Sequence, residues 1–207
     1  MPEMEWLPNP PDGEQICIGF DGSETDDWTV IQAETRDGYS FTPQYGPDAR
    51  PTIWNPAEWG GQVPRGEVFS AIDELLTRFK VRLAYCDPPG WQTDIFKWDE
   101  MADRRGVFME WATYRQAPMF SALKRFETDL AQGRIRHDGC PLATLAIRNA
   151  KKVAQTNQRY RLGKPSQNQK IDPAMGRILA HEACMDAFEA GWPSEEPKPA
   201  RLRRFTR

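Results

Sequence analysis

The chain has 207 residues, of which 39% are hydrophobic and 18 are proline, and its formal net charge is −3. This length suits one domain with a core of ordinary size, and the many prolines predict long loops around that core. No apolar run approaches the ~20 residues that span a bilayer, and the first residues lack the basic and apolar regions of a signal peptide. We therefore expect a soluble, intracellular protein.

The first predicted elements are strands. Residues 1–14 are rich in proline and glycine and predict an extended linker. A domain covering 15–192 then begins with an apolar strand that ends at Asp21. Residues 28–35 and 39–42 predict two further strands, and the Asp37-Gly38 pair between them is a hairpin signal. We therefore expect three antiparallel strands at the start of the domain.

Helices and strands alternate further along the chain. Residues 43–64 hold five prolines and predict an irregular loop. Apolar periodicity predicts helices at 67–79, about 93–105, 118–132 and 141–153, the last with Leu142, Leu145 and Ile147 toward the core. Strands are predicted at 81–86, 107–111 and 134–137, and a basic hairpin or loop at 154–170. The final helix is predicted from Pro173 to Ala190 with Asp172 as its cap, followed by a basic, disordered tail at 193–207.

Positive charge is concentrated in one region of the chain. Residues 104–177 contain fifteen Lys or Arg and five acids, whereas the remainder carries a net charge of −13. A segregated basic region is typical of proteins that bind a polyanion such as nucleic acid. Basic surfaces also occur for solubility alone.

The cysteines and histidines raise the question of a structural metal. Four cysteines lie far apart in the sequence and predict no disulfide framework: Cys17, Cys86, Cys140 and Cys184. The two histidines of the chain both occur in His-x-x-Cys pairs, His137 with Cys140 and His181 with Cys184, so a zinc site is conceivable. Zinc signatures space their ligands differently, and we favour two unrelated surface histidines.

The predicted elements place three acids at element boundaries. Antiparallel strands followed by alternating strands and helices indicate an α/β fold with a central mixed sheet flanked by helices. In this layout Asp21 and Asp87 end neighbouring strands, because Pro88-Pro89 stops the second strand, and the last helix brings Asp172 across them. Converging carboxylates favour hard divalent cations such as Mg²⁺ or Mn²⁺. Two such ions about 4 Å apart would activate a water and stabilise the leaving oxygen of a phosphodiester.

Each acid also has a purely structural explanation when taken alone. Asp21 is compatible with a turn, Asp87 with a strand end before proline, and Asp172 with a helix cap. Their joint occurrence at three boundaries, on a chain with a basic region, favours a catalytic metal-binding triad.

Three motifs occur in a distinctive order along the chain. They are Ile18-Gly19-Phe20-Asp21-Gly22-Ser23, Tyr85-Cys86-Asp87-Pro88-Pro89-Gly90 and Lys170-Ile171-Asp172-Pro173-Ala174-Met175. In this order and spacing, the region from Ile16 to Trp192 resembles the nuclease domain of the large terminase subunit of tailed bacteriophages. The resemblance implies an RNase H-like fold and a two-metal endonuclease that cuts concatemeric viral DNA during packaging. It also implies that Asp21, Asp87 and Asp172 are the catalytic and metal-binding acids, with Asp21 bridging the ions.

Other charged residues are candidates for supporting roles. Asp26 and Asp27 lie close enough to Asp21 in sequence to assist through water, or are solvated turn acids. Lys164 and Lys170 are candidates to hold the scissile phosphate, or belong to a generic basic loop. Contacts to the backbone of duplex DNA are expected from five basic residues: Arg148, Lys151, Lys152, Arg159 and Arg161.

The chain contains no Gly-x-x-x-x-Gly-Lys-Ser/Thr phosphate loop, whereas a full large terminase begins with a packaging ATPase. We therefore expect an excised domain or a separately encoded nuclease subunit. The resemblance implies that it acts in the host cytoplasm beside an ATPase domain or subunit, the portal and the small terminase subunit. Two alternatives stay open: another RNase H-like nuclease, such as a junction resolvase or repair enzyme that prefers branched DNA, and a non-catalytic DNA-binding module.

Overall fold

The computed structural model describes residues 5–166 and 168–192. Its main sheet contains β1 (Gln15–Asp21), β2 (Thr29–Thr35), β3 (Tyr39–Phe41), β6 (Ile53–Trp54), β7 (Lys80–Cys86), β8 (Phe108–Glu110) and β9 (Arg136–His137). The helices are α1 (Arg65–Arg78), α2 (Gln92–Met101), α3 (Gln116–Ala131), α4 (Pro141–Asn149) and α5 (Asp172–Glu189). Two small sheets pair β4 (Gln44–Tyr45) with β5 (Arg50–Pro51), and β10 (Lys151–Ala154) with β11 (Tyr160–Gly163).

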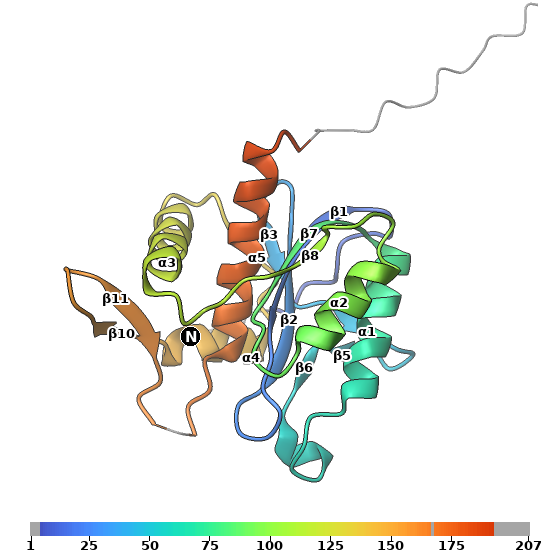
Figure 1. Cartoon of the computed structure of the whole chain (residues 1–207), viewed down its shortest axis with the longest axis horizontal. Coiled ribbons are helices and arrows are strands. Elements are labelled where there is room, and N and C mark those ends of the chain that lie inside the picture. Colours follow the sequence, from blue (N-terminus) through green and yellow to red (C-terminus); the bar gives the residue numbers. More distant parts are fainter. Residues whose placement is uncertain (1–4, 167, 193–207) are drawn as a thin grey trace, which may run out of the picture.

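The sheet separates two layers of helices (Figure 1). Its strand order is β8-β7-β1-β2-β3-β9, with β6 also paired to β2. Helices α1 and α2 cover one face, whereas α3, α4 and α5 lie on the other, with the β10–β11 hairpin beyond α3. The strands β1, β2 and β3 are antiparallel, and β7 and β8 run parallel to β1. The predicted mixed sheet flanked by helices is therefore confirmed.

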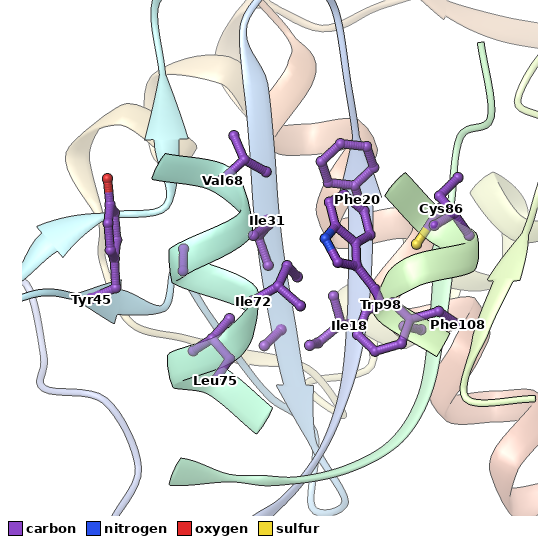
Figure 2. Packing of buried hydrophobic residues seen from close by; sticks show 14 of the residues in the cluster. Ile18, Phe20, Ile31, Tyr45, Val68, Ile72, Leu75, Cys86, Trp98 and Phe108 are labelled. Atoms are coloured by element: carbon purple, nitrogen blue, oxygen red, sulfur yellow. The ribbon is translucent and has the colours of Figure 1, made fainter. Parts of the chain in front are cut away.

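Side-chain alternation along β1 determines which layer each residue meets. Ile18 and Phe20 belong to the large core against α1 and α2 (Figure 2), where the Phe20 ring lies 5.0 Å from the rings of both Trp91 and Trp98. Cys17, one residue out of phase, packs instead with buried residues of α5. Asp21 is in phase with Cys17, so its carboxylate is directed to the α5 face.

Glycine allows α5 to lie very close to β1. A Cβ atom added at Gly19 would lie 2.0 Å from the Gly176 carbonyl oxygen and 2.4 Å from the Ala180 backbone nitrogen. A Cβ at Gly176 would in turn lie 2.9 Å from Cγ of Gln32 on β2. All three distances are shorter than real Cβ contacts, so these two glycines set how closely the helix approaches the sheet.

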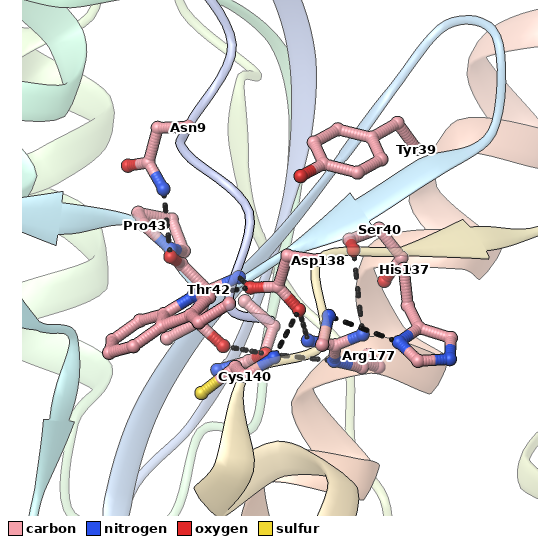
Figure 3. A network of polar contacts seen from close by, with 12 residues as sticks. Asn9, Tyr39, Ser40, Thr42, Pro43, His137, Asp138, Cys140 and Arg177 are labelled. Atoms are coloured by element: carbon pink, nitrogen blue, oxygen red, sulfur yellow. Dashed lines mark hydrogen bonds and ion pairs between the residues drawn. The ribbon is translucent and has the colours of Figure 1, made fainter. Parts of the chain in front are cut away.

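A buried ion pair ties α5 to the loop that follows β9 (Figure 3). Arg177 Nη2 lies 2.6 Å from Asp138 Oδ1, and their side chains are 2% and 0% exposed. Asp138 Oδ2 accepts the backbone N–H of Thr42 at 2.8 Å and the indole N–H of Trp6 at 3.2 Å. A buried ion pair is stable only when its remaining polar atoms are bonded, and this network meets that condition. It joins α5, the end of β3 and the segment before β1.

Two predicted elements are wrong. Residues 43–64 are not an irregular loop, because they contain β4, β5, β6 and a 3₁₀ helix at Pro56–Trp59. Their prolines are compatible with short strands at a sheet edge, where no backbone donor is required. Residues 1–4 of the predicted linker and the predicted tail at 193–207 lie outside the described ranges.

The predicted helix at 141–153 is too long. It ends at Asn149, Ala150 is extended with φ −62° and ψ 127°, and Lys151 and Lys152 lie on β10 instead. Pairing with β11, across a turn in which Asn157 and Gln158 both have φ 57°, outweighs the local helix tendency. The predicted inward face is wrong for Leu142 and Leu145, which are exposed, whereas Ile147 is half-buried and the neighbouring alanines are buried. Small residues suit the close approach of α4 to α5.

The prediction of two surface histidines is wrong for His181, which is 2% exposed. Its Nδ1 lies 2.9 Å from Glu34 Oε1 and its Nε2 lies 3.0 Å from Asp129 Oδ2. All four cysteines are free thiols, as predicted. Over residues 5–166 and 168–192, the histidines and cysteines do not assemble into a group of three or more that could hold a metal ion. Nor is any helix in those ranges long and apolar enough to cross a bilayer.

The first prediction concerns the approach of α5 to β1. We expect Gly19→Ala to lower the free energy of unfolding by about 2 to 4 kcal/mol, because the added methyl group meets backbone atoms that have no room to move. Urea unfolding followed by circular dichroism measures this change. Gly66→Ala on α1 is the matched control, since a Cβ there meets no atom within 4 Å. Equal stability of the two variants would contradict the prediction.

The second prediction concerns His181. Burial alone lowers the pKa of His181, but the hydrogen bonds and charges of Glu34 and Asp129 outweigh it and raise the pKa above 6.5. A histidine with a raised folded pKa stabilises the fold fully below pH 6.5, and this contribution is lost as the pH rises through the folded value. We expect His181→Gln to cost about 2 to 4 kcal/mol at pH 6 and less at pH 9, measured by urea unfolding.

The exposed His137 provides the control for this measurement. Burial and the charge of Arg177 lower the pKa of His137, so its contribution becomes less favourable as the pH falls, and His137→Gln should cost no more at pH 6 than at pH 9. A cost of His181→Gln that does not vary with pH would show that the imidazole does not act through its charge.

Candidate active site

Two of the predicted acids lie side by side at one edge of the sheet. Asp21 is the last residue of β1, and Asp87 directly follows the parallel strand β7. The backbone N–H of Asp87 donates to the Phe20 carbonyl at 2.9 Å, which aligns the two strand ends. Asp87 is in phase with Tyr85, which packs against α5, so Asp87 faces the same layer as Asp21.

The third acid, Asp172, is supplied by α5. The predicted cap role is wrong, because Ile171 is the cap residue and Asp172 is the first residue of the helix. Its side chain is therefore not engaged in capping and is directed into the space beside the strand ends. The Oδ2 atom of Asp172 is buried and has no hydrogen-bond partner. An unpartnered buried carboxylate oxygen is costly when the group is charged, so the folded chain gives this oxygen no compensation of its own.

The three acids line one cavity of about 360 Å³. Its wall combines the end of β1, the turn that follows, the end of β7, the loop after β8, the end of β11 and the start of α5. Residues far apart in sequence therefore meet here. Other polar side chains on the wall are Ser23, Asp27, Thr113, Arg161 and Lys164.

Burial is the largest influence on the acids of this cavity, and nearby negative charges add to it at Asp21 and Asp172. Burial and the nearby charges of Asp172, Asp87 and Asp27 raise the pKa of Asp21 well above its usual value. Burial and the charge of Asp27 raise the pKa of Asp172 to about 6, although backbone N–H groups and Lys170 oppose this rise. Burial also raises the pKa of Asp87, against the hydrogen bonds from Thr113. Perturbed acids clustered in a cavity are typical of functional sites.

Thr113 is a functional candidate that the sequence did not reveal. Its backbone N–H donates to Asp87 Oδ1 at 2.9 Å, and its hydroxyl also bonds to that carboxylate. Thr113 lies in the loop between β8 and α3, far from any recognised motif. Its position over Asp87 depends on the parallel pairing of β8 with β7, so no local signal identifies it.

The donor set fits a hard divalent cation. Three carboxylates share the cavity, their charges repel, and one buried oxygen lacks a partner. Oxygen ligands of this kind suit Mg²⁺ or Mn²⁺. In the described ranges, no three His, Cys, Asp or Glu side chains have the arrangement of a completed metal site. The acids therefore share a cavity without forming a preassembled ligand cluster.

The residues predicted to have supporting roles differ in their contacts. Asp26 is exposed on the turn after β1. Asp27 is engaged: its Oδ1 lies 2.5 Å from Lys164 Nζ and 2.8 Å from Lys170 Nζ. Both lysines therefore converge on one carboxylate oxygen beside the three acids.

The five basic residues predicted to bind DNA lie on or next to α4 and the β10–β11 hairpin. Lys151, Lys152 and Arg161 lie on the two strands of the β10–β11 hairpin, and Arg148 lies near the end of α4. Arg161 contributes directly to the cavity wall. Lys152 is paired with Glu127 of α3 at 2.8 Å. Arg159 precedes β11 near the hairpin turn.

The third prediction concerns the energetic cost of the acids. Because the pKa of Asp172 is raised from 3.8 to about 6, the folded chain binds this proton more tightly than the unfolded chain. The destabilising charge is absent below about pH 4 and fully present above about pH 6. We expect Asp172→Asn to raise the free energy of unfolding by about 1 to 3 kcal/mol at pH 7.5 in a metal chelator, and to have no effect near pH 4.

Urea unfolding at the two pH values measures this effect. Asp73→Asn, at an exposed position of α1 on the other face of the sheet, is the control and should be neutral at both. A loss of stability in Asp172→Asn at pH 7.5 would show that the carboxylate is compensated within the folded chain.

Comparison with known proteins agrees with this arrangement. Residues 49–187 match the family described as the terminase large subunit, endonuclease domain. The Gene 13 proteins of Mycobacterium phages D29 and L5 are 26% and 25% identical over 186 residues, which cover 84% of this chain and 30% of each relative. The chain thus spans less than a third of the length of these relatives.

Solved structures show the same fold. The large terminase nuclease from thermophilic phage G20c superposes with a TM-score of 0.61 at 13% identity, over 87% of this chain and 94% of that one. The HK97 bacteriophage large terminase gives a TM-score of 0.60 at 19% identity, over 85% of this chain and 40% of that one. The G20c nuclease has also been crystallised with magnesium and with cobalt. Since the family match covers most of its length, the chain belongs to the family of terminase large subunit endonuclease domains, with their RNase H-like fold.

Proposed function

We propose that the chain is a metal-dependent endonuclease that cuts double-stranded viral concatemer DNA during genome packaging. The observation that carries this proposal is the meeting of Asp21, Asp87 and Asp172 in one cavity, with an unpartnered buried oxygen on Asp172. Family membership supports a packaging nuclease. The magnesium-bound G20c nuclease supports a divalent cation as cofactor.

The three acids would hold two Mg²⁺ or Mn²⁺ ions. When bound, such ions activate a water and stabilise the leaving oxygen of the cleaved phosphodiester. Asp21 ends the central strand beside both other acids and is the candidate to bridge the ions. Thr113 fixes the orientation of the Asp87 carboxylate through two hydrogen bonds, as a supporting partner of a metal ligand commonly does.

Duplex DNA would approach along the β10–β11 hairpin and the end of α4. The five basic residues of this region would contact backbone phosphates and contribute little base readout: Arg148, Lys151, Lys152, Arg159 and Arg161. Arg161, on the cavity wall, would hold the backbone nearest to the acids. Binding of this kind weakens steeply as salt is added.

Other components of a packaging assembly would supply the DNA. The relatives are much longer than this chain, which supports an additional ATPase domain or subunit in the complete machine. We include the portal and the small terminase subunit as further partners, and the host cytoplasm as the site of action.

The fourth prediction tests the nuclease directly. We expect the purified chain to nick and linearise supercoiled plasmid with Mg²⁺ or Mn²⁺ and to lose this activity in a chelator. Asp21→Asn, Asp87→Asn and Asp172→Asn should each reduce the rate by about 100-fold or more, because each removes a charge that stabilises the reaction. Asp73→Asn should retain the wild-type rate.

The melting temperature, measured with and without metal, separates a nuclease from a non-catalytic DNA-binding module. Metal should raise the melting temperature of the wild type and of Asp73→Asn, but not of the triad variants. Equal inactivity of wild type and variants, without any metal-dependent stabilisation, would refute the nuclease and leave a DNA-binding module. Faster cleavage of branched than of linear duplex would indicate a junction-resolving enzyme.

A further inference from the structure

The contact of Asp27 with two lysines is more than the turn needs for its own stability. Lys164 Nζ and Lys170 Nζ both approach Oδ1 of Asp27, and Lys170 Nζ also donates to the Asp26 carbonyl at 2.7 Å. The turn is already held by other bonds. The Ser23 hydroxyl accepts the Asp27 backbone N–H at 3.2 Å, and the Thr29 hydroxyl donates to the Ser23 carbonyl at 2.8 Å.

The charges at this cluster are unbalanced. Two ammonium groups face one carboxylate, and Asp27 also adds to the repulsion on Asp21 and Asp172. The side chains of Lys164, Lys170 and Asp27 are 25%, 17% and 37% exposed, so solvent and ligands reach all three. A phosphodiester has the same single charge as a carboxylate and also presents two free oxygens. It can therefore replace Asp27 between the two ammonium groups.

The position of the cluster matches that of a DNA backbone. Asp27 and Lys164 line the same cavity as the three acids, and Arg161 lies on the same wall. Lys164 directly follows β11, so this contact also joins the hairpin to the turn after β1. A strand of DNA that follows the hairpin to the acids would pass the two lysines.

We propose that Lys164 and Lys170 form a binding site for one backbone phosphate of duplex DNA, and that Asp27 occupies this site in the free protein. DNA must displace the Asp27 carboxylate before a phosphate can contact both lysines, so Asp27 weakens DNA binding. In the absence of DNA, the contact of Asp27 with Lys164 also restrains the hairpin. This inference rests on the proposed function, since it takes DNA as the ligand of the same cavity.

Equilibrium binding of a short fluorescein-labelled duplex to the full chain in a chelator tests the inference without cleavage. We expect Asp27→Asn to tighten binding about fivefold and to steepen the slope of log K against log salt by about 1 between about 50 and 200 mM KCl, because two lysines become available to phosphate. Asp26→Asn is the matched control. It removes an exposed acid from the same turn and should change affinity by less than about twofold.

A variant that lacks both lysines provides the decisive control. In the variant carrying Lys164→Gln and Lys170→Gln, Asp27→Asn should no longer tighten binding, because no masked site remains. Asp27→Ser serves as a second uncharged variant, and circular dichroism verifies the fold of each.

The inference is overturned if Asp27→Asn behaves like Asp26→Asn, or if its effect persists without the lysines, which would show general charge repulsion. Either result, obtained while the wild type still cuts plasmid, leaves the nuclease intact. Absence of both DNA binding and cleavage in the wild type overturns the inference together with the proposed function.

Discussion

The close packing of α5 against β1 is the constraint on which the remaining structure depends. Gly19 and Gly176 allow the helix backbone to approach the sheet without an intervening side chain. This approach places the first residue of α5, Asp172, beside the strand ends that bear Asp21 and Asp87. A single methyl group at Gly19 would push the helix away, so the geometry of the acids depends on a residue that has no chemistry of its own.

Polar contacts hold α5 in this position along its length. Arg177 is paired with Asp138 in the middle of the helix, and His181 bridges Glu34 and Asp129 one turn further on. These buried groups are costly to leave unpaired, so rotation or sliding of α5 would break several bonds at once. The helix is thereby fixed at its middle while its N-terminus carries an acid with an unpartnered oxygen.

The cavity combines destabilising and compensating charges. Burial raises the pKa of all three acids, and the charges of Asp172 and Asp87 raise that of Asp21 further, whereas two lysines are paired with the nearby Asp27. Sites that prepare for a charged ligand are commonly less stable when empty than they would be without their functional groups. If the two proposals hold, the acids and the Asp27–Lys164 contact lie on one cavity wall, and metal and DNA would each relieve a different part of the imbalance.

The sequence by itself determined the mixed α/β fold and the strand ends at Asp21 and Asp87, because alternation, a hairpin turn and consecutive prolines act over a few residues. It also indicated that the last helix delivers Asp172, but the assignment of this residue as a cap was wrong. Tertiary structure alone decided where α4 ends, since strand pairing outweighs helix propensity at Lys151 and Lys152. It also decided the burial of His181, the support of Asp87 by Thr113, and the contact of Asp27 with Lys164, whose residues are 137 positions apart. Such contacts depend on how distant elements pack, and no local pattern in the chain encodes that packing.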